Sequence, residues 1–371
     1  MSSRKITVAG LFSGCGGLDF GFMKAGYDIT WSNEINSDAA ISYERLIGHK
    51  PVVDDIWNVI EQVPNVDVII GGPPCQSFSL AGKRIEDDPR GKLVLAYYQV
   101  VKKVMPKLFV MENVSGLISS KIDGVRMPDY LKKKFEDLGY KVVVKKLIAT
   151  DFFVPQKRNR VFLIGHKCNE FDVEILKMKD FSHAAKLENM NKVVSVSDAL
   201  DDLGSPLPKG VSSFIKYKTK PHSSYSLLMR GRDESGTDLH TMPTMSDKDR
   251  AFVKHIPPGG NYTNIPDDIS TDRIMRIKET GGRTTTYGRL HPDKPAYTIN
   301  TYFNRPNVGA NYHHSEDRLI TVREAMRLQS FPDYFSPYYT NQRSLHMQIG
   351  NAVPPLMAMA VAESLKGLFE K

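Results

Sequence analysis

The chain has 371 residues, 41% of them hydrophobic and 25% charged, so it can bury a large core and is typical of a folded protein of two or three domains. It contains no run of roughly 18 apolar residues and no signal-peptide core, so we expect a cytoplasmic protein that makes no contact with a membrane. Three cysteines without metal-type spacing indicate neither a disulfide framework nor a metal site, and the net charge of +8 favours a polyanionic partner such as nucleic acid.

The first half of the chain alternates short apolar runs with helical patterns. The runs that predict strands are Ile6–Phe12, Ile29–Ser32, Val66–Ile70, Leu108–Met111, Val142–Ile148 and Val161–Ile164. Strands and helices in alternation predict an α/β fold with a Rossmann-like, doubly wound, mostly parallel sheet.

A glycine cluster, Gly14-x-Gly16-Gly17, lies between the first strand and a helix. Glycines at this position let the backbone approach a nucleotide-like ligand, although a tight turn is the simpler alternative. Glu34, at the end of the second strand, is placed for ribose hydroxyls, and Asp55 for an adenine amino group. Either acid can also be a solvated or capping residue. Because no G-K-[ST] phosphate loop is present, an adenosine without phosphates fits better than a nucleoside triphosphate.

The segment G-G-P-P-C-Q-S-F-S at 71–79 directly follows the apolar run that ends at Ile70. In open α/β sheets, ligands bind beyond the carboxyl ends of the strands, and the stiff Pro-Pro pair presents Cys75 there. A thiol on a rigid turn suits a nucleophile, whereas a turn cysteine without a role is the alternative.

Two further segments carry ionisable side chains next to predicted strands. Glu112 follows an apolar run, and a carboxyl shielded in this way can share a proton near neutral pH; a loop-bridging role is the alternative. Arg158 and Arg160 lead into the strand that starts at Val161. Because alternate residues of a strand point to one face, we expect the two guanidinium groups to project together. They would suit a carboxylate, a phosphate or a carbonyl oxygen, unless they form a surface charge cluster.

The composition changes after about His166. Residues 205–310 are rich in Pro, Gly, Ser, Thr, Asn, Tyr and Arg and show no strong helical period, which predicts a second, smaller, loop-rich domain. Thr321 and Glu324 form a capping box that begins a short helix, which Pro332 terminates. A final helix is predicted over Leu356–Phe369.

These segments together resemble the cytosine-C5 DNA methyltransferases of the prokaryotic restriction-modification type, in the order of that family and over most of the chain. The matching segments are L-F-S-G-C-G-G at 11–17, S-N-E at 32–34, D-I at 55–56, G-G-P-P-C-Q-S-F-S at 71–79, D-P-R-G-K-L at 88–93, M-E-N-V at 111–114, Q-K-R-N-R at 156–160, R-L-H-P at 289–292 and G-N-A-V-P-P at 350–355. One departure is Gly10, where the family often carries an Asp; it affects a contact of the first strand and leaves the resemblance intact.

The resemblance implies the activity of a DNA (cytosine-5-)-methyltransferase. Cys75 would add as a thiolate to C6 of the target cytosine, Glu112 would bond at N3, and Arg160 with Arg158 would hold the base oxygen and Glu112. Carbon 5 would then take the methyl group of S-adenosyl-L-methionine, leaving S-adenosyl-L-homocysteine. The target cytosine must be flipped out of the duplex, which costs a few kcal/mol in unstacking.

The resemblance also implies domain roles and contact residues. It predicts a catalytic and cofactor-binding domain at residues 1–185, a target-recognition domain at 186–310, and a segment at 311–371 that completes the catalytic domain. The implied cofactor contacts are Phe12, Ser13, Gly14, Cys15, Gly16, Gly17, Glu34, Ile35, Asp55, Ile56, Pro74, Leu93, Asn351 and Ala352. The candidate DNA contacts are Gln76, Ser79, Lys83, Arg84, Arg90, Arg230, Arg232, Arg283, Tyr287, Arg289, Thr298 and Asn304. Residues 79–91 resemble a mobile loop that closes over DNA.

The expected partner is double-stranded DNA, bound by a monomer, and a cognate restriction endonuclease would act on the same site without a stable complex. Three alternatives stay open. An RNA cytosine methyltransferase shares the scaffold, but the long variable segment favours duplex DNA. A nicotinamide-dependent oxidoreductase would need the full G-x-G-x-x-G pattern. A DNA-binding protein with an inactive methyltransferase fold would not need Cys75, Glu112 and Arg160 intact.

Overall fold

The computed structural model describes residues 4–74, 89–122, 124–168, 170–177, 192–209, 211, 214–217, 219–231 and 235–370. The chain divides into two compact units. The first comprises Met1–Ile148, Asn159–Lys177 and Pro355–Lys371, and the second comprises Ala149–Arg158 and Met178–Pro354. Among the described residues, no helix is long and apolar enough to cross a membrane.

The first unit is built on a six-stranded sheet with the order β2-β1-β3-β4-β9-β7. The strands are β1 (Thr7–Leu11), β2 (Asp28–Ser32), β3 (Val68–Gly71), β4 (Leu108–Val114), β7 (Lys141–Ile148) and β9 (Asn159–His166). β1 pairs in parallel with β2 and β3, and β3 with β4, whereas β9 is antiparallel to both β4 and β7. The predicted α/β fold with a mostly parallel sheet is confirmed.

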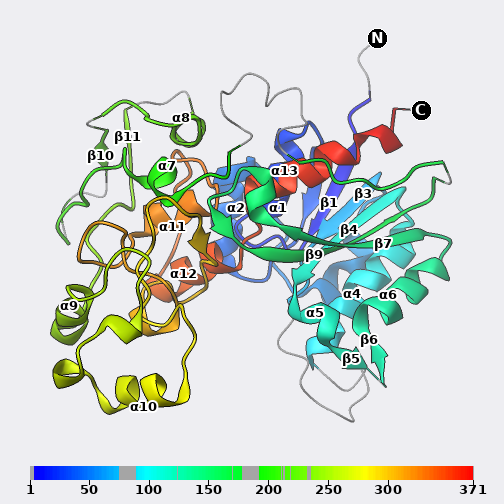
Figure 1. The fold of residues 1–371 in the computed structure, drawn as a ribbon. Helices are drawn as coiled ribbons and strands as arrows, with labels where there is room; N and C mark the ends of the chain where they lie inside the picture. The colour runs from blue at the N-terminus through cyan, green and yellow to red at the C-terminus, as the bar shows by residue number, and fades with distance from the viewer. Residues whose placement is uncertain are drawn as a thin grey trace. The chain divides into compact units, whose positions relative to one another are not determined.

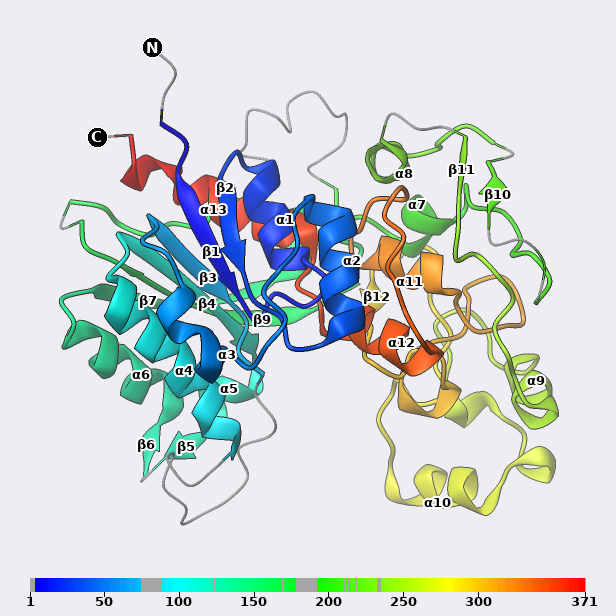
Figure 2. The same cartoon turned by 180° about the vertical axis from the view of Figure 1, so that it is seen from behind.

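Helices cover both faces of this sheet (Figures 1 and 2). They are α1 (Gly17–Lys24), α2 (Ser37–Ile47), α3 (Ile56–Val59), α4 (Pro89–Val104), α5 (Gly116–Ser119), α6 (Met127–Glu136) and α13 (Pro355–Ser364), and a short hairpin joins β5 (Lys121–Ile122) to β6 (Val125–Arg126). On one face, Leu11 and Phe109 join a buried apolar cluster with α4 and α6. On the other face, α1 packs so closely on α13 that a Cβ at Gly21 would lie 2.4 Å from that of Ala358.

The second unit consists of short elements joined by long loops, as its Pro- and Gly-rich composition predicts. Its helices are α7 (Val196–Leu200), α8 (Ser224–Arg230), α9 (Asp247–Val253), α10 (Asp272–Thr280), α11 (Val322–Leu328) and α12 (Gln342–Asn351). Two-residue strands pair β8 (Gln156–Lys157) with β12 (Ala296–Tyr297) and β10 (Ile215–Lys216) with β11 (Gly236–Thr237). The predicted capping box at Thr321 and Glu324 is present and begins α11.

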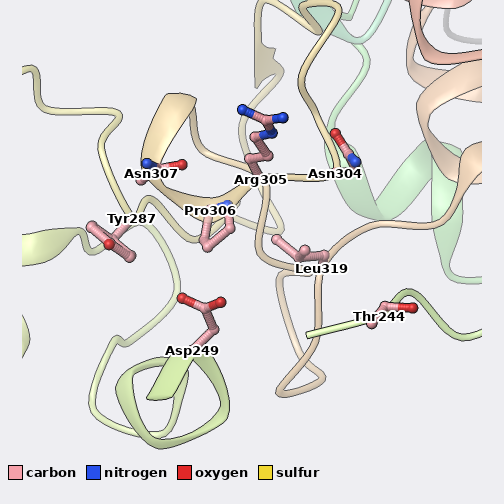
Figure 3. Close-up of a pocket in the computed structure, with 8 residues that line it drawn as sticks. All are labelled: Thr244, Asp249, Tyr287, Asn304, Arg305, Pro306, Asn307 and Leu319. Atoms are coloured by element: carbon pink, nitrogen blue, oxygen red, sulfur yellow. The ribbon is translucent and has the colours of Figure 1, made fainter. Parts of the chain in front are cut away.

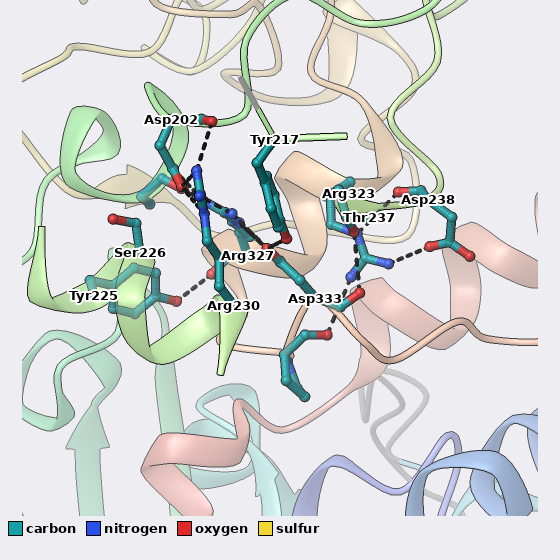
Figure 4. Close-up of polar contacts among 12 residues, drawn as sticks. Asp202, Tyr217, Tyr225, Ser226, Arg230, Thr237, Asp238, Arg323, Arg327 and Asp333 are labelled. Carbon is teal, nitrogen blue, oxygen red and sulfur yellow. Dashed lines mark hydrogen bonds and ion pairs between the residues drawn. The ribbon is translucent and has the colours of Figure 1, made fainter. Parts of the chain in front are cut away.

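A buried network of ion pairs explains why residues 311–354 belong to the second unit (Figure 4). Arg327, which is inaccessible to solvent, pairs with Asp202 and with Asp333. Buried charges are retained where they are paired, so this network fixes α11 to the residues around 202. The second unit therefore extends to Pro354, beyond residue 310, where the predicted target-recognition domain ends.

Candidate active site

The glycine loop lies at the carboxyl end of β1, where the strand order of the sheet reverses because β2 and β3 flank β1 on opposite sides. Ligands of open α/β sheets bind at such a point. Gly14 and Gly16 have φ values of 55° and 93°, and Gly16 caps α1. A Cβ at Gly14 would meet nothing within 4 Å, so the space beside this residue is open.

Glu34 follows β2 and connects the glycine loop to the start of α2. Its carboxylate accepts hydrogen bonds from the backbone N–H groups of Gly14 and Asn36, both at 2.8 Å. Burial raises the pKa of Glu34 above its ordinary value. The next side chain, Ile35, is 66% exposed, so an apolar surface adjoins this fixed carboxyl group.

Asp55 is held near the end of β2 by the side chain of Asn33. The Asn33 amide donates to the carbonyl oxygens of Val52 and Asp54, at 3.1 and 2.9 Å. Asp55 caps α3 by accepting from the Trp57 N–H, and the adjacent Ile56 is buried. Two carboxyl groups that can accept hydrogen bonds, an apolar surface and an open glycine backbone suit an adenosine rather than a phosphate.

Glu112 and Arg160 form an ion pair on the neighbouring strands β4 and β9. Arg160 Nε lies 2.5 Å from Glu112 Oε1, and each side chain is about nine-tenths buried. Gly72 leaves room for the carboxylate, because a Cβ there would lie 2.9 Å from Glu112 Oε2. Next to Glu112, the Asn113 amide donates to the Pro73 carbonyl at 3.1 Å and so fixes the turn that leads to Pro74.

Several predicted site residues lie outside the described part of the chain. They are Cys75, Gln76, Ser79, Lys83, Arg84 and Arg232, together with the side chain of Arg90. Among the described cysteines, Cys15 is buried within the glycine loop, and burial raises the pKa of its thiol to about 12. Cys15 therefore stays neutral at physiological pH and does not suit a nucleophile.

The expectation that Arg158 projects with Arg160 is wrong. Arg158 is 1% exposed and donates to three backbone carbonyls: Ile299 at 2.8 Å, Gly350 at 2.8 Å and Ala352 at 3.0 Å. The strand β9 begins only at Asn159, so the alternation on which the prediction rested does not extend to Arg158. Arg158 fixes the turn at residues 350–352, whereas Arg160 pairs with Glu112.

Two glutamines that the sequence analysis missed support the same turn. Gln156 accepts from the Ile299 N–H at 2.9 Å and donates to the Leu328 carbonyl at 2.9 Å, and Gln329 donates to the Ile349 carbonyl. A Cβ at Gly350 would lie 2.4 Å from the Thr301 nitrogen, so only glycine fits there. The Q-x-R spacing in 156–158 was visible in the sequence, but its partners lie about 140 to 190 residues away.

Two of the arginines expected to contact DNA are engaged inside the second unit. Arg230 is 2% exposed, donates to the Asp202 carboxylate at 2.7 Å and stacks on Tyr217 (Figure 4). Arg289 donates to the carbonyls of His313 and Ile256, both at 3.0 Å. Reading a base would require these buried groups to leave their partners, so both expectations are corrected to structural roles.

Three of the four remaining candidates for DNA contact are accessible to solvent, and the fourth, Tyr287, is buried. Arg283, Thr298 and Asn304 are exposed. Asn304 and the largely buried Tyr287 line a pocket of about 330 Å³, shown in Figure 3. The other residues that line it are Thr244, Asp249, Arg305, Pro306, Asn307 and Leu319. Such a mixture of amides, hydroxyls, a carboxylate and a guanidinium can both donate and accept hydrogen bonds.

Comparison with known proteins identifies the family of this chain. The family model of the C-5 cytosine-specific DNA methylases matches residues 6–367. The chain belongs to this family. The type II methyltransferase M.NgoFVII of Neisseria gonorrhoeae is 32% identical to this methyltransferase over 99% of this chain and 88% of its own length. M1.HphI of Haemophilus parahaemolyticus is 33% identical over 97% of this chain and 86% of its own length.

Solved structures agree with this assignment. A DNA modification methyltransferase encoded within an E. coli prophage superposes with a TM-score of 0.75 at 25% identity, covering 99% of this chain and 100% of that one. The Dnmt2 methyltransferase of S. pombe shares the fold, with a TM-score of 0.63 at 17% identity over 98% of this chain and 100% of its own. This methyltransferase is thus a DNA cytosine-5 methyltransferase of the kind found in restriction-modification systems.

Proposed function

We propose that this methyltransferase transfers a methyl group from S-adenosyl-L-methionine to carbon 5 of one cytosine within a specific sequence of double-stranded DNA. The target base would be flipped out of the duplex and bonded through C6 to Cys75. The observation that supports this most strongly is the buried Glu112–Arg160 pair. It lies on the sheet edge that also carries the glycine loop and the turn ending in Pro74, directly before Cys75.

The residues at this edge fit the cofactor. Glu34 would accept from the ribose hydroxyls, Asp55 would accept from the adenine amino group, and the exposed Ile35 would cover the adenine ring. The open space beside Gly14 would admit the rest of the molecule. When bound, S-adenosyl-L-methionine supplies a methyl group activated by a sulfonium. The remaining predicted cofactor contacts in the first unit are Phe12, Ser13, Cys15, Gly16, Gly17, Ile56, Pro74 and Leu93.

Asn351 and Ala352 are also predicted to contact the cofactor, but they belong to the second unit and not to the unit that carries the glycine loop. Arg158 would act on them by holding the backbone of their turn. We therefore assign Arg158 a positioning role and no contact with the reacting base.

The proposed chemistry uses three side chains. Cys75 as a thiolate would add to C6, and the electron pair displaced from the C5–C6 bond would make carbon 5 nucleophilic. Glu112 would bond at N3 and stabilise the charge that develops on the ring, and Arg160 would hold both the Glu112 carboxyl group and the base oxygen. Once carbon 5 carries the methyl group, loss of its proton and of the Cys75 thiolate restores the aromatic ring. A covalent adduct divides one difficult step into two easier ones.

We propose that Arg283, Thr298 and Asn304 contact DNA, with Tyr287 lining the pocket beside Asn304. An arginine that reads guanine contributes about 1–3 kcal/mol of discrimination, whereas most polar contacts hold the backbone. The relatives are named as type II methyltransferases, which supports duplex DNA as the substrate and a cognate restriction endonuclease that shares the site without a stable complex. We propose that the enzyme acts as a monomer, since one chain carries every residue invoked here.

The test starts with bisulfite sequencing of a plasmid from cells that express the protein, which identifies the modified site. A duplex with 5-fluorocytosine at that site is then incubated with the enzyme and cofactor. Because fluorine cannot leave as the proton does, the adduct persists, and we expect a covalent complex on a denaturing gel. Cys75→Ser should abolish the complex. A wild-type enzyme that methylates DNA without forming the complex would overturn the proposed mechanism, and preferential methylation of tRNA would favour the RNA alternative.

A further inference from the structure

The first strand lacks a side chain at position 10, and an acid from the following helix occupies the vacant space. A Cβ at Gly10 would lie only 1.9 Å from Asp19 Oδ1 and 2.8 Å from Ser13 Oγ. Gly10 does not have a left-handed backbone conformation, so the restriction at this position is one of space. A side chain at position 10 and the Asp19 carboxyl group therefore exclude each other.

Asp19 lies in the first turn of α1, is 1% exposed, and faces the glycine loop. Its Oδ1 accepts from the hydroxyl of Ser13 at 3.2 Å and from that of Tyr43 at 3.0 Å. Ser13 is the residue of the loop directly before Gly14. One carboxyl oxygen thus holds the beginning of the loop directly.

Tyr43 carries the effect of Asp19 to the end of the loop. Its ring is fully buried and supports Gly16, where a Cβ would lie 3.1 Å from Tyr43 Cδ2. Tyr43 comes from α2, so Asp19 joins the loop, α1 and α2 through a single group. The charged residue that faces this group is Glu34, across the loop. Burial, together with a smaller effect of Glu34, raises the pKa of Asp19 to about 7.

We infer that Asp19, which occupies from α1 the space beside Gly10, is a positioning residue for S-adenosyl-L-methionine. By holding Ser13 and, through Tyr43, Gly16, it keeps the glycine loop in the conformation that accepts the cofactor. This inference rests on the proposed function, because it requires that the loop binds the cofactor.

The experiment measures binding of S-adenosyl-L-methionine to the full-length protein by calorimetry. Asp19→Ala removes the acceptor of two buried hydroxyls, and we expect the affinity to fall by at least about tenfold. Asp19→Asn keeps an acceptor oxygen and should bind within about threefold of wild type. The matched control is Asp129→Ala, which removes an exposed acid from the first turn of α6 and should bind as wild type does.

An exchange of positions separates this role from a general contribution to folding. Gly10→Asp alone should bind poorly, because its side chain collides with Asp19. In the double variant Gly10→Asp/Asp19→Ala, the strand β1 supplies the carboxyl group in place of α1. This variant should recover most of the affinity that Asp19→Ala loses. In steady-state assays, Asp19→Ala should raise KM for the cofactor and leave KM for DNA unchanged.

Each result has one interpretation. If wild type does not bind S-adenosyl-L-methionine, the proposed function fails. If wild type binds and Asp19→Ala binds equally well, the inference is overturned while the proposed function stands. Should Asp19→Ala fail to fold, the double variant decides: recovered folding and binding support the inference, and a double variant no better than Asp19→Ala overturns it.

Discussion

Replacing Arg158 by Met tests whether this arginine holds the turn at residues 350–352 or acts on the base. Methionine fills the space of the aliphatic stem but donates no hydrogen bond. Three backbone carbonyls would lose their donor, those of Ile299, Gly350 and Ala352. The first two belong to buried residues, whereas Ala352 is partly exposed, so water can replace the lost bond there.

The magnitude follows from these burial differences. A buried acceptor left without a partner costs about 1–3 kcal/mol, so two of them predict a loss of about 4 kcal/mol in the free energy of unfolding. With a slope of about 2–3 kcal/mol per molar urea, the unfolding midpoint should fall by roughly 1–2 M. The total stability of a protein of this kind, about 5–15 kcal/mol, leaves the variant folded at 25 °C.

The assay is urea unfolding monitored by circular dichroism, combined with the 5-fluorocytosine trap. Arg158→Met should lose stability and still form some covalent complex. Arg160→Met should form none, since it removes the partner of Glu112. Lys157→Met, an exposed neighbour, is the control and should behave as wild type. An Arg158→Met protein that is as stable as wild type but unable to form the complex would refute the structural role.

Three further perturbations test other parts of the structure. Asp202→Ala leaves the buried Arg230 without a carboxylate and leaves Arg327 with Asp333 alone, so the free energy of unfolding should fall by about 3–5 kcal/mol. The exposed Asp247→Ala is the control, and a loss no larger than in that control would contradict the argument. Because the pKa of Asp19 is raised to about 7 by burial, its contribution to stability is complete below the ordinary carboxyl pKa and disappears as pH rises through 7. Relative to Asp19→Asn, wild type should therefore lose up to about 1.4 kcal/mol per pH unit over that interval in urea titrations, and parallel pH profiles would argue against it. Gly72→Ala places a Cβ 2.9 Å from Glu112 Oε2 and so displaces this carboxylate. Single-turnover methylation should slow by about 10²-fold or more while cofactor affinity stays constant. An unchanged rate would show that Glu112 tolerates its displacement.

Local patterns predicted the elements of the first unit well. The six apolar runs correspond to β1, β2, β3, β4, β7 and β9 with shifts of a few residues at the ends. Hydrophobic periodicity and glycine placement are local properties, and burial of a strand on both faces leaves a continuous apolar run. The capping box at Thr321 was readable for the same reason, because both of its hydrogen bonds lie within one helical turn.

The predictions that failed concern side chains whose partners are distant in sequence. Arg158 was assigned by strand alternation and by the resemblance, and Arg230 and Arg289 as candidate DNA contacts, yet all three are buried and bonded to groups of the second unit. The sequence does not distinguish an arginine that faces DNA from one that donates to a backbone carbonyl. Only the packing around it distinguishes the two cases.

The sequence by itself determined the family, the parallel sheet and the order of the chemical groups along its edge, because strand ends and glycine turns are encoded locally. Tertiary structure alone decided that Arg160 and not Arg158 meets Glu112, and that Asp19 fills the space beside Gly10. The physical reason is that burial and hydrogen bonding depend on which distant segments share a volume, and the order of residues along one strand does not specify this.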